Sequence, residues 1–344
     1  MKTKLVSVMK LTKDRMDNLV PQAERVQLIN TLKTTGATHL EIATVIGHPN
    51  FAEHSKLWAK DIHDAGLLVT WRSAHQNMEG LYGAEKYVGT LRKPPQFWID
   101  EAVNAFNLIK DSIKAGDEEA IYPERTEGIF QDSTAFIGSG LPASYGTFFR
   151  DLHDTLDIFL WTVGLSANNA SEYFSGWMPK LVSDTYGVTV VDHYVDGDPI
   201  KFEADVRTLK TKYGKPVYVQ EGSPSRFVKA TYDQAKTFFN VCKKLDDENL
   251  IYGFGSWSGW AGNPESIVDK INGVYSLNDS GKALKEWWNI IVPEPEPTPT
   301  PEINIDIALK SMEILRQVTV IVFGIGTLTL KVTKLKELLS KPIE

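Results

Sequence analysis

The chain has 344 residues, with 37 Lys and Arg residues against 44 Asp and Glu residues, and a formal net charge of -7. This acidic balance, without a block of basic residues, argues against nucleic-acid binding, which needs a concentrated positive face. The single cysteine, Cys242, excludes an intramolecular disulfide and a zinc or iron–sulfur site built on cysteines. We therefore expect no metal ion and no cofactor.

The N-terminal segment starts with basic residues but has no long apolar run. Lys10, Lys13 and Asp14 interrupt it, so we expect no secretory signal peptide. Its apolar residues instead predict a first strand over residues 5–11.

From there to residue 292, segments of strand and helix character alternate. Apolar runs of strand length cover residues 5–11, 38–44, 67–73, 120–124, 162–166, 189–194, 217–221 and 251–257. Amphipathic segments of helix length lie between them, among them 23–35, 53–65 and 95–115. Glycine follows several of these segments, as expected for a left-handed C-cap: Gly36, Gly66, Gly116, Gly187 and Gly214.

Repeated strand–helix–strand units require parallel strands joined by right-handed crossovers. Eight of them predict an α/β fold, a closed (β/α)8 TIM barrel over residues 1–292. A doubly wound open sheet is the alternative. It is disfavoured because no glycine-rich phosphate loop follows the first strand.

A proline-rich segment separates this body from the rest of the chain. Residues 293–302 read PEPEPTPTPE, and five prolines in ten residues cannot join a helix or a central strand. They favour an extended, semi-rigid linker. All nine tryptophans precede it.

The C-terminal tail, residues 303–344, has a heptad pattern that predicts an apolar helical segment. Its seam is Ile314, Val318, Ile321, Ile325, Leu328, Val332, Leu335 and Leu339. We expect the tail to form a homo-oligomer through a coiled coil, or to dock on a larger assembly. Membrane contact and a tail without function are the alternatives. The uncharged stretch 317–330 is shorter than the ~20 residues that span a bilayer, so it could enter a membrane only in part.

Reactive groups of a TIM barrel lie at the C-terminal ends of its strands. The fourth strand is followed by Glu124 and Glu127, and the seventh ends in Glu221. Two carboxylates facing each other across a barrel suit glycosidic bond cleavage, because one protonates the leaving oxygen while the other acts on the anomeric carbon. At a separation of about 5–5.5 Å the second attacks directly and the anomeric configuration is retained.

Aromatic, imidazole and guanidinium groups accompany these carboxylates. Trp257 and Trp260 follow the eighth strand and can stack on sugar rings, while His193 and Tyr194 end the sixth. The end of the third strand adds three residues that could form one wall of a cleft: Trp71, Arg72 and His75.

This pattern resembles the clan of (β/α)8 retaining glycoside hydrolases, whose acid/base follows strand four and whose nucleophile ends strand seven. The segment from Lys215 to Gly222 is similar to the clan's nucleophile strand. Asp192-His193-Tyr194 resembles its strand-six signature, in which an aromatic or imidazole group helps to hold the nucleophile. Trp257 matches the clan's strand-eight tryptophan at the sugar-binding subsite.

The resemblance implies that Glu221 is the nucleophile and Glu124 the general acid/base, with Glu127 as the competing acid/base. One position departs from the clan's pattern. The clan usually has Asn directly before the acid/base, where it contacts the sugar 2-hydroxyl, and this chain has Pro123.

We therefore expect a retaining hydrolase of a β-linked oligo- or polysaccharide. The alternative is a catalytically inactive carbohydrate-binding or structural barrel, anchored to a surface or a phage particle through its tail. A virion or surface component is favoured over a free cytoplasmic protein, because a proline linker is typical of displayed modules and no signal peptide is expected.

Overall fold

The computed structural model describes residues 1–74, 94–122, 142–157, 168–195 and 198–289. His75, Glu124, Glu127, the expected strand at 162–166, the linker and the tail lie outside these residues. The chain divides into two compact units at residues 290 and 291. The described residues belong to the first unit, Met1–Ile290.

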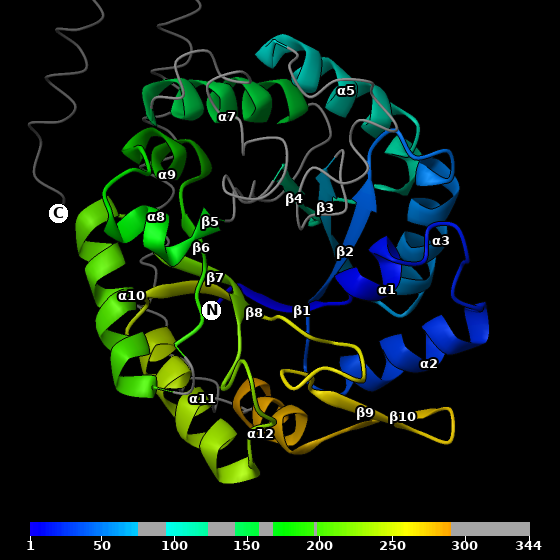
Figure 1. The fold of residues 1–344 in the computed structure, drawn as a ribbon, viewed down its shortest axis with the longest axis vertical. Helices are drawn as coiled ribbons and strands as arrows, with labels where there is room; N and C mark the ends of the chain where they lie inside the picture. Colours follow the sequence, from blue (N-terminus) through cyan, green and yellow to red (C-terminus); the bar gives the residue numbers. More distant parts are fainter. Residues whose placement is uncertain (75–93, 123–141, 158–167, 196–197, 290–344) are drawn as a thin grey trace, which may run out of the picture. The chain divides into compact units, whose positions relative to one another are not determined.

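A parallel sheet of eight strands forms the centre of this unit, in the order β4-β3-β2-β1-β8-β7-β6-β5 (Figure 1). The strands are β1 (Thr3–Ser7), β2 (His39–Val45), β3 (Leu68–Ala74), β4 (Glu118–Ile121), β5 (Asn168–Asn169), β6 (Thr189–Asp192), β7 (Val217–Gly222) and β8 (Ile251–Ser256). Except for β4 and β5, which stand at the two ends of this order, neighbours in sequence are neighbours in the sheet, and β1 pairs with both β2 and β8. This cyclic order confirms the predicted barrel architecture.

Helices surround the sheet in the order expected for strand–helix alternation (Figure 1). The longer ones are α2 (Gln22–Lys33), α3 (Phe51–Asp64), α5 (Pro95–Asn107), α7 (Pro142–Leu156), α10 (Pro199–Tyr213), α11 (Tyr232–Asp247) and α12 (Asp279–Trp288). Short ones are α1 (Met9–Lys13), η1 (Lys110–Ser112), α8 (Ala170–Phe174) and α9 (Lys180–Tyr186). A hairpin of β9 (Val268–Ile271) and β10 (Val274–Leu277) precedes α12.

Local sequence signals explain where several helices begin and end. Thr231 and Gln234 form a capping box at the start of α11, and the Asp198 side chain accepts backbone hydrogen bonds at the start of α10. The five glycines predicted at helix ends all have positive φ angles, from 72° at Gly187 to 100° at Gly116. Because other residues rarely adopt this backbone, glycine correctly marked the helix ends at Gly36, Gly66, Gly187 and Gly214, whereas Gly116 lies in the turn between η1 and β4.

Two predicted boundaries were wrong. The first strand ends at Ser7 rather than at residue 11, because α1 begins at Met9 and turns the chain away from the sheet. The predicted helix over 95–115 ends at Asn107, and η1 follows it. The first segment is short and apolar, and such segments do not distinguish strand from helix by periodicity. In the second, the helical spacing of apolar residues continues past Asn107 into η1, so the sequence did not mark where the α-helix ends.

Four tryptophans on helices are buried, with exposed fractions between 0% and 6%: Trp58, Trp98, Trp287 and Trp288. Trp287 stacks on Phe239 and packs edge-on against Phe254, which links α12 to α11 and β8. None of the helices in the described part of the chain is both long and apolar enough to cross a bilayer.

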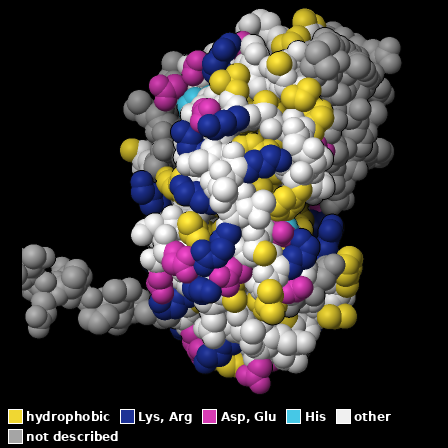
Figure 2. All heavy atoms as spheres, turned by 90° about the vertical axis from the view of Figure 1, so that its left-hand side faces the viewer, with side chains coloured by type: hydrophobic (Ala, Val, Ile, Leu, Met, Phe, Trp, Pro, Cys, Tyr) yellow, Lys and Arg dark blue, Asp and Glu magenta, His cyan; other side chains and the backbone are white. Residues whose placement is uncertain are grey.

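The outer surface over α8, α9 and α10 mixes basic and acidic side chains (Figure 2). Arg207 of α10 pairs with Glu203 at 2.8 Å and with Glu248 at 2.6 Å. Exposed pairs of this kind contribute at most about 1 kcal/mol each. The stability of the barrel therefore depends mainly on its interior.

The barrel interior contains buried carboxylates held by hydroxyl groups. Glu118 of β4 is fully buried and accepts hydrogen bonds from Thr3 at 2.7 Å, Thr70 at 3.1 Å and Tyr218 at 2.9 Å. These donors come from β1, β3 and β7. One buried acid thus connects four strands, and its hydrogen bonds offset the cost of removing it from water.

Candidate active site

Glu221 lies near the C-terminal end of β7 with both carboxylate oxygens engaged. Its exposed fraction is 4%. Arg72 of β3 forms an ion pair with Oε1, and the Tyr194 hydroxyl donates to Oε2 at 2.8 Å. Three separate strand ends therefore meet at this carboxylate, as the sequence predicted for the end of strand seven.

An irregular register lets two consecutive residues of β7 reach the barrel interior. Side chains of a regular strand alternate between faces. Here the pairing of β7 with β6 and with β8 shifts near its C-terminal end. Gln220 consequently donates to Glu41 while Glu221 contacts Arg72.

Gly255 permits this arrangement, because a Cβ atom at that position would lie 1.9 Å from the carbonyl oxygen of Gln220. A side chain there would have to displace β7 from β8. The glycine therefore permits the close approach of β7 and β8 next to Glu221.

A second carboxylate, Glu41 of β2, lies beneath the first and is fully buried. It accepts a hydrogen bond from Ser7 at 2.8 Å, and its Oε1 lies 3.7 Å from Arg72 Nη1. Arg72 is also fully buried, between Glu41 and Glu221. Glu41 was not predicted as a site residue, although a carboxylate in a strand flanked by Leu40 and Ile42 is a usable signal.

Burial raises the pKa of Glu221 above its usual value, the positive charge of Arg72 opposes this, and the nearby charge of Glu41 adds to the rise. Hydrogen bonds from Tyr194 and Arg72 also favour the ionised form. The two donors therefore stabilise the charged carboxylate against the effect of burial.

Trp257 lies beside this group and is partly exposed. The Arg72 guanidinium lies over its ring, 5.9 Å from the centroid. Trp260, 6% exposed, packs edge-on against Trp257 with ring centroids 5.5 Å apart. Trp257 thus offers an aromatic surface, and the ring of Trp260 packs against it.

Glu265 completes the described part of the group and was not identified from the sequence. It is 7% exposed and interacts through hydrogen bonds with Trp257 and Asn263. Burial raises its pKa to about 7; Arg226 opposes the rise and Glu221 adds to it. A carboxyl group that is half protonated near neutral pH therefore lies next to the candidate sugar-binding tryptophan.

The structure does not bring Trp71 and His193 into this group, which corrects their expected place at the cleft. Trp71 is fully buried, and its indole donates to Asp117 at 2.9 Å. His193 lies 2.9 Å from Asp205 of α10 and stacks on Phe202. The physical reason is alternation: each directly precedes a residue that faces Glu221, so its own side chain points toward the helices.

The chain leaves β4 in an unusual conformation, directly before the segment that carries Glu124. Tyr122 has a φ angle of 53°, although it is not glycine, and its hydroxyl donates to the carbonyl of Trp98 at 2.8 Å. Such backbone costs about 1–3 kcal/mol and persists where the surroundings hold it.

In the regions that the structure describes, no cluster of three or more His, Cys, Asp or Glu side chains could hold a metal ion.

Several solved structures have a similar fold at low sequence identity. An exo-β-1,4-mannosidase from Opitutaceae bacterium strain TAV5 aligns with a TM-score of 0.61 and 10% identity, over 83% of this chain and 59% of its own length. A GH5_18 protein from Streptomyces cattleya, crystallised with Manb1-4GlcNAc, aligns with a TM-score of 0.60 and 13% identity, over 86% and 82%. The endo-β-1,4-mannanase of Thermotoga petrophila aligns with a TM-score of 0.54 and 9% identity, over 84% and 76%.

The fold is the (β/α)8 barrel that these solved glycoside hydrolases have. This confirms the resemblance inferred from the strand-end motifs. No protein-family model matches the sequence, and neither does any curated protein. At these identities the likeness establishes the fold alone, and the chain spans 59% of the length of the Opitutaceae mannosidase.

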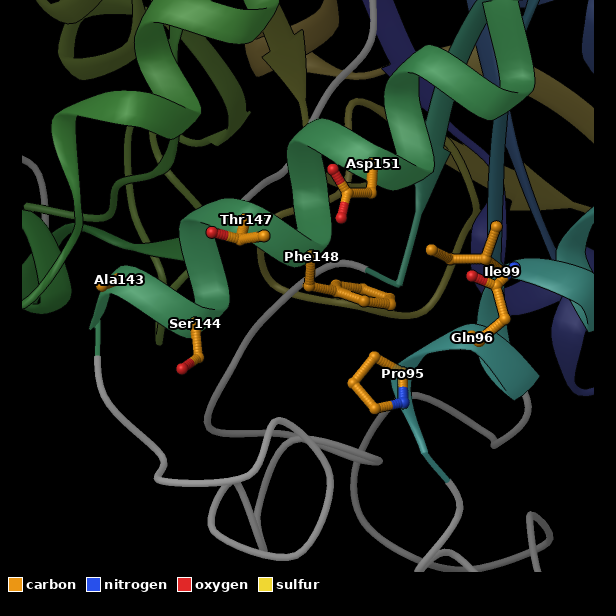
Figure 3. A pocket seen from close by; sticks show the side chains of 8 residues that line it. All are labelled: Pro95, Gln96, Ile99, Ala143, Ser144, Thr147, Phe148 and Asp151. Carbon is orange, nitrogen blue, oxygen red and sulfur yellow. The ribbon is translucent and has the colours of Figure 1, made fainter.

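A separate pocket of about 420 Å³ lies on the helical layer of this glycoside hydrolase fold. Figure 3 shows Phe148 of α7 pointing toward Pro95 and Ile99 of α5. The pocket shares no lining residue with the group around Glu221. Among the described residues that line it, Asp151 is the charged one.

Glu265 gives a prediction for the pH dependence of stability. The folded-state pKa of Glu265 is about 7 and exceeds the usual 4.5. The contribution of this carboxyl to the free energy of unfolding is therefore fully present below pH 4.5 and is lost as the pH rises through about 7. We expect the Glu265→Gln variant to gain stability relative to the natural protein between about pH 5 and about pH 8.5. Urea unfolding at both pH values measures this difference, and parallel pH profiles would contradict the assignment.

Proposed function

We propose that residues 1–292 form a retaining glycoside hydrolase that cleaves a β-linked glycan, with Glu221 as the nucleophile. The observation that carries the proposal is the buried Glu221 carboxylate, held on one oxygen by Arg72 and on the other by Tyr194. Trp257 beside it supplies an aromatic surface for a sugar ring. The names of the structural neighbours, which include β-1,4-mannanases and a mannosidase, support the same class of substrate.

In the proposed reaction Glu221 attacks the anomeric carbon while a second carboxylic acid protonates the departing oxygen. The C–O bond breaks, and a covalent glycosyl ester forms on Glu221. A water molecule then loses a proton to the second carboxylate and displaces the ester, which restores both groups. Arg72 and Tyr194 hold the attacking carboxylate in one orientation and stabilise its charge when it leaves.

We assign the acid/base role to Glu124, which follows β4, with Glu127 as the competing residue. We expect Glu124→Gln to lower kcat on substrates with poor leaving groups by about 10²–10⁴-fold. Dinitrophenyl glycosides should be affected much less in the first step, because their leaving group needs no proton. Azide should restore turnover of such substrates and give a glycosyl azide.

The matched control is Glu127→Gln, which removes a carboxylate three residues away. If Glu127→Gln rather than Glu124→Gln shows the dependence on leaving group and the rescue by azide, the two roles are exchanged. Steady-state rates on a series of aryl glycosides measure both variants.

Turnover itself tests the proposed function. The intact chain is incubated with aryl β-glycosides and with β-linked glycans, and the first-formed anomer is recorded by NMR. We expect β-linked substrates to give the β-anomer. Pro123 favours the inactive carbohydrate-binding barrel as a second candidate, because it stands where the clan has a sugar-contacting Asn. Glycan binding without turnover on every substrate would support that candidate.

A further inference from the structure

The loop between β7 and α11 exposes four consecutive residues, 226–229, close to Glu221. Arg226, Phe227 and Val228 follow Glu221 by five, six and seven positions, and all three are exposed. The exposed fraction is 70% for Phe227 and 66% for Val228. Because the loop starts at the C-terminal end of β7, these residues belong to the face of the barrel on which reactive groups lie.

Arg226 has a defined position in this loop. Its guanidinium carbon lies 4.8 Å from the ring centroid of Tyr194 and 5.7 Å from that of Phe227. Tyr194 is the residue that donates to Glu221. A positive charge is therefore held against the aromatic ring that separates it from the proposed nucleophile.

This charge lies against two aromatic rings. Among the residues that the structure describes, Arg226 contacts rings and forms no ion pair within 4 Å. Burial raises the pKa of Glu265 to about 7, and the charge of Arg226 opposes this rise. Glu265 is therefore only about half ionised at neutral pH. A cation with an exposed aromatic ring beside it suits a sugar ring that carries a negative substituent.

We propose that Arg226 and Phe227 form a subsite for an acidic sugar, one with a carboxylate or sulfate group, next to the bond that is cleaved. Arg226 binds the anionic substituent and Phe227 stacks on the ring. The inference rests on the proposed function for the position of the scissile bond, but binding of the acidic glycan does not depend on turnover.

Affinity electrophoresis of the full chain tests the proposal. Native gels at about 0.15 M salt contain hyaluronan, which has carboxylates, keratan sulfate, which has sulfates, or neutral β-mannan. A protein of net charge -7 is repelled by a polyanion overall, so retardation requires a local site. We expect retardation by at least one acidic glycan, and about a tenfold higher Kd for Arg226→Gln. Phe227→Ala should weaken binding in the same gel.

Lys229→Gln is the matched control, because Lys229 lies in the same loop and its loss changes the net charge equally. Lys229 is paired with Asp269 at 2.7 Å, so its replacement should leave binding unchanged. Equal effects of the two substitutions, unchanged binding by Arg226→Gln, or equal retardation by neutral β-mannan would overturn the proposal. The retarding glycan identifies the anion as carboxylate or sulfate. Turnover of neutral aryl glycosides decides the proposed function separately.

Discussion

Replacing Glu221 by glutamine is expected to lower kcat by at least about 10³-fold while the barrel stays folded. An amide has the shape of the carboxylate but cannot form the glycosyl ester. Its oxygen can accept from Arg72, and its NH₂ group can donate to the Tyr194 hydroxyl, which turns to accept. Arg72 also keeps Glu41 as a counter-ion, 3.7 Å away. We therefore expect the free energy of unfolding to change by less than about 2 kcal/mol.

The measurement is kcat on activated aryl β-glycosides together with urea unfolding of the same samples. Glu286→Gln is the matched control, because Glu286 is likewise held by a tyrosine and a cation, Tyr232 and Lys236, but on the surface. The control should retain full activity. Undiminished turnover by Glu221→Gln would remove Glu221 from the nucleophile role.

Much of the fold could be predicted from the sequence because parallel barrels leave strong local signals. Buried parallel strands are short apolar runs, and the run at 217–221 ends in Glu221, a carboxylate that the structure places among charged and aromatic partners. Glycine after a helical segment correctly marked helix ends at Gly187 and Gly214. These signals depend only on residues that are close in sequence, so they can be recognised without the tertiary structure.

The candidate site was harder to predict because its composition depends on which face each side chain occupies. The sequence places Trp71 next to Arg72 and His193 next to Tyr194, which predicts that both members of each pair face the site. The structure separates each pair, with one member facing Glu221 and the other the helices. Strict alternation would have found this.

At Gln220 and Glu221, however, strict alternation would have assigned one of the two side chains to the wrong face. The shifted register of β7 sends both side chains inward. Glu41 and Glu265 come from distant parts of the chain. Their proximity to Glu221 follows from barrel closure, which no local pattern encodes.

Arg72 provides the test with the largest expected effect on stability. It is fully buried between Glu41 and Glu221 and contacts the ring of Trp257. In Arg72→Met the apolar volume is largely kept, but two buried carboxylates lose their cation. Breaking a buried ion pair in this way costs about 3–5 kcal/mol, because the remaining charge stays desolvated. We expect a loss of that size in urea unfolding near neutral pH.

The surface substitution Arg207→Met is the control, since it also removes an arginine that pairs with two glutamates. These pairs are exposed, so the expected loss is at most about 1 kcal/mol. Similar losses for the two variants would mean that the buried cation contributes no more than a surface one.

The pH dependence distinguishes loss of charge compensation from loss of packing. The pKa of Glu221 is already raised in the folded protein, and removal of the Arg72 charge should raise it further. A carboxyl with a raised folded-state pKa stabilises the protein fully below its unfolded pKa, and this contribution is lost as the pH rises through the folded value. The deficit of Arg72→Met should therefore shrink as the pH falls toward about 4.5 and be largest in alkaline solution. A deficit that stays constant with pH would indicate that Arg72 acts through packing against Trp257 rather than through its charge.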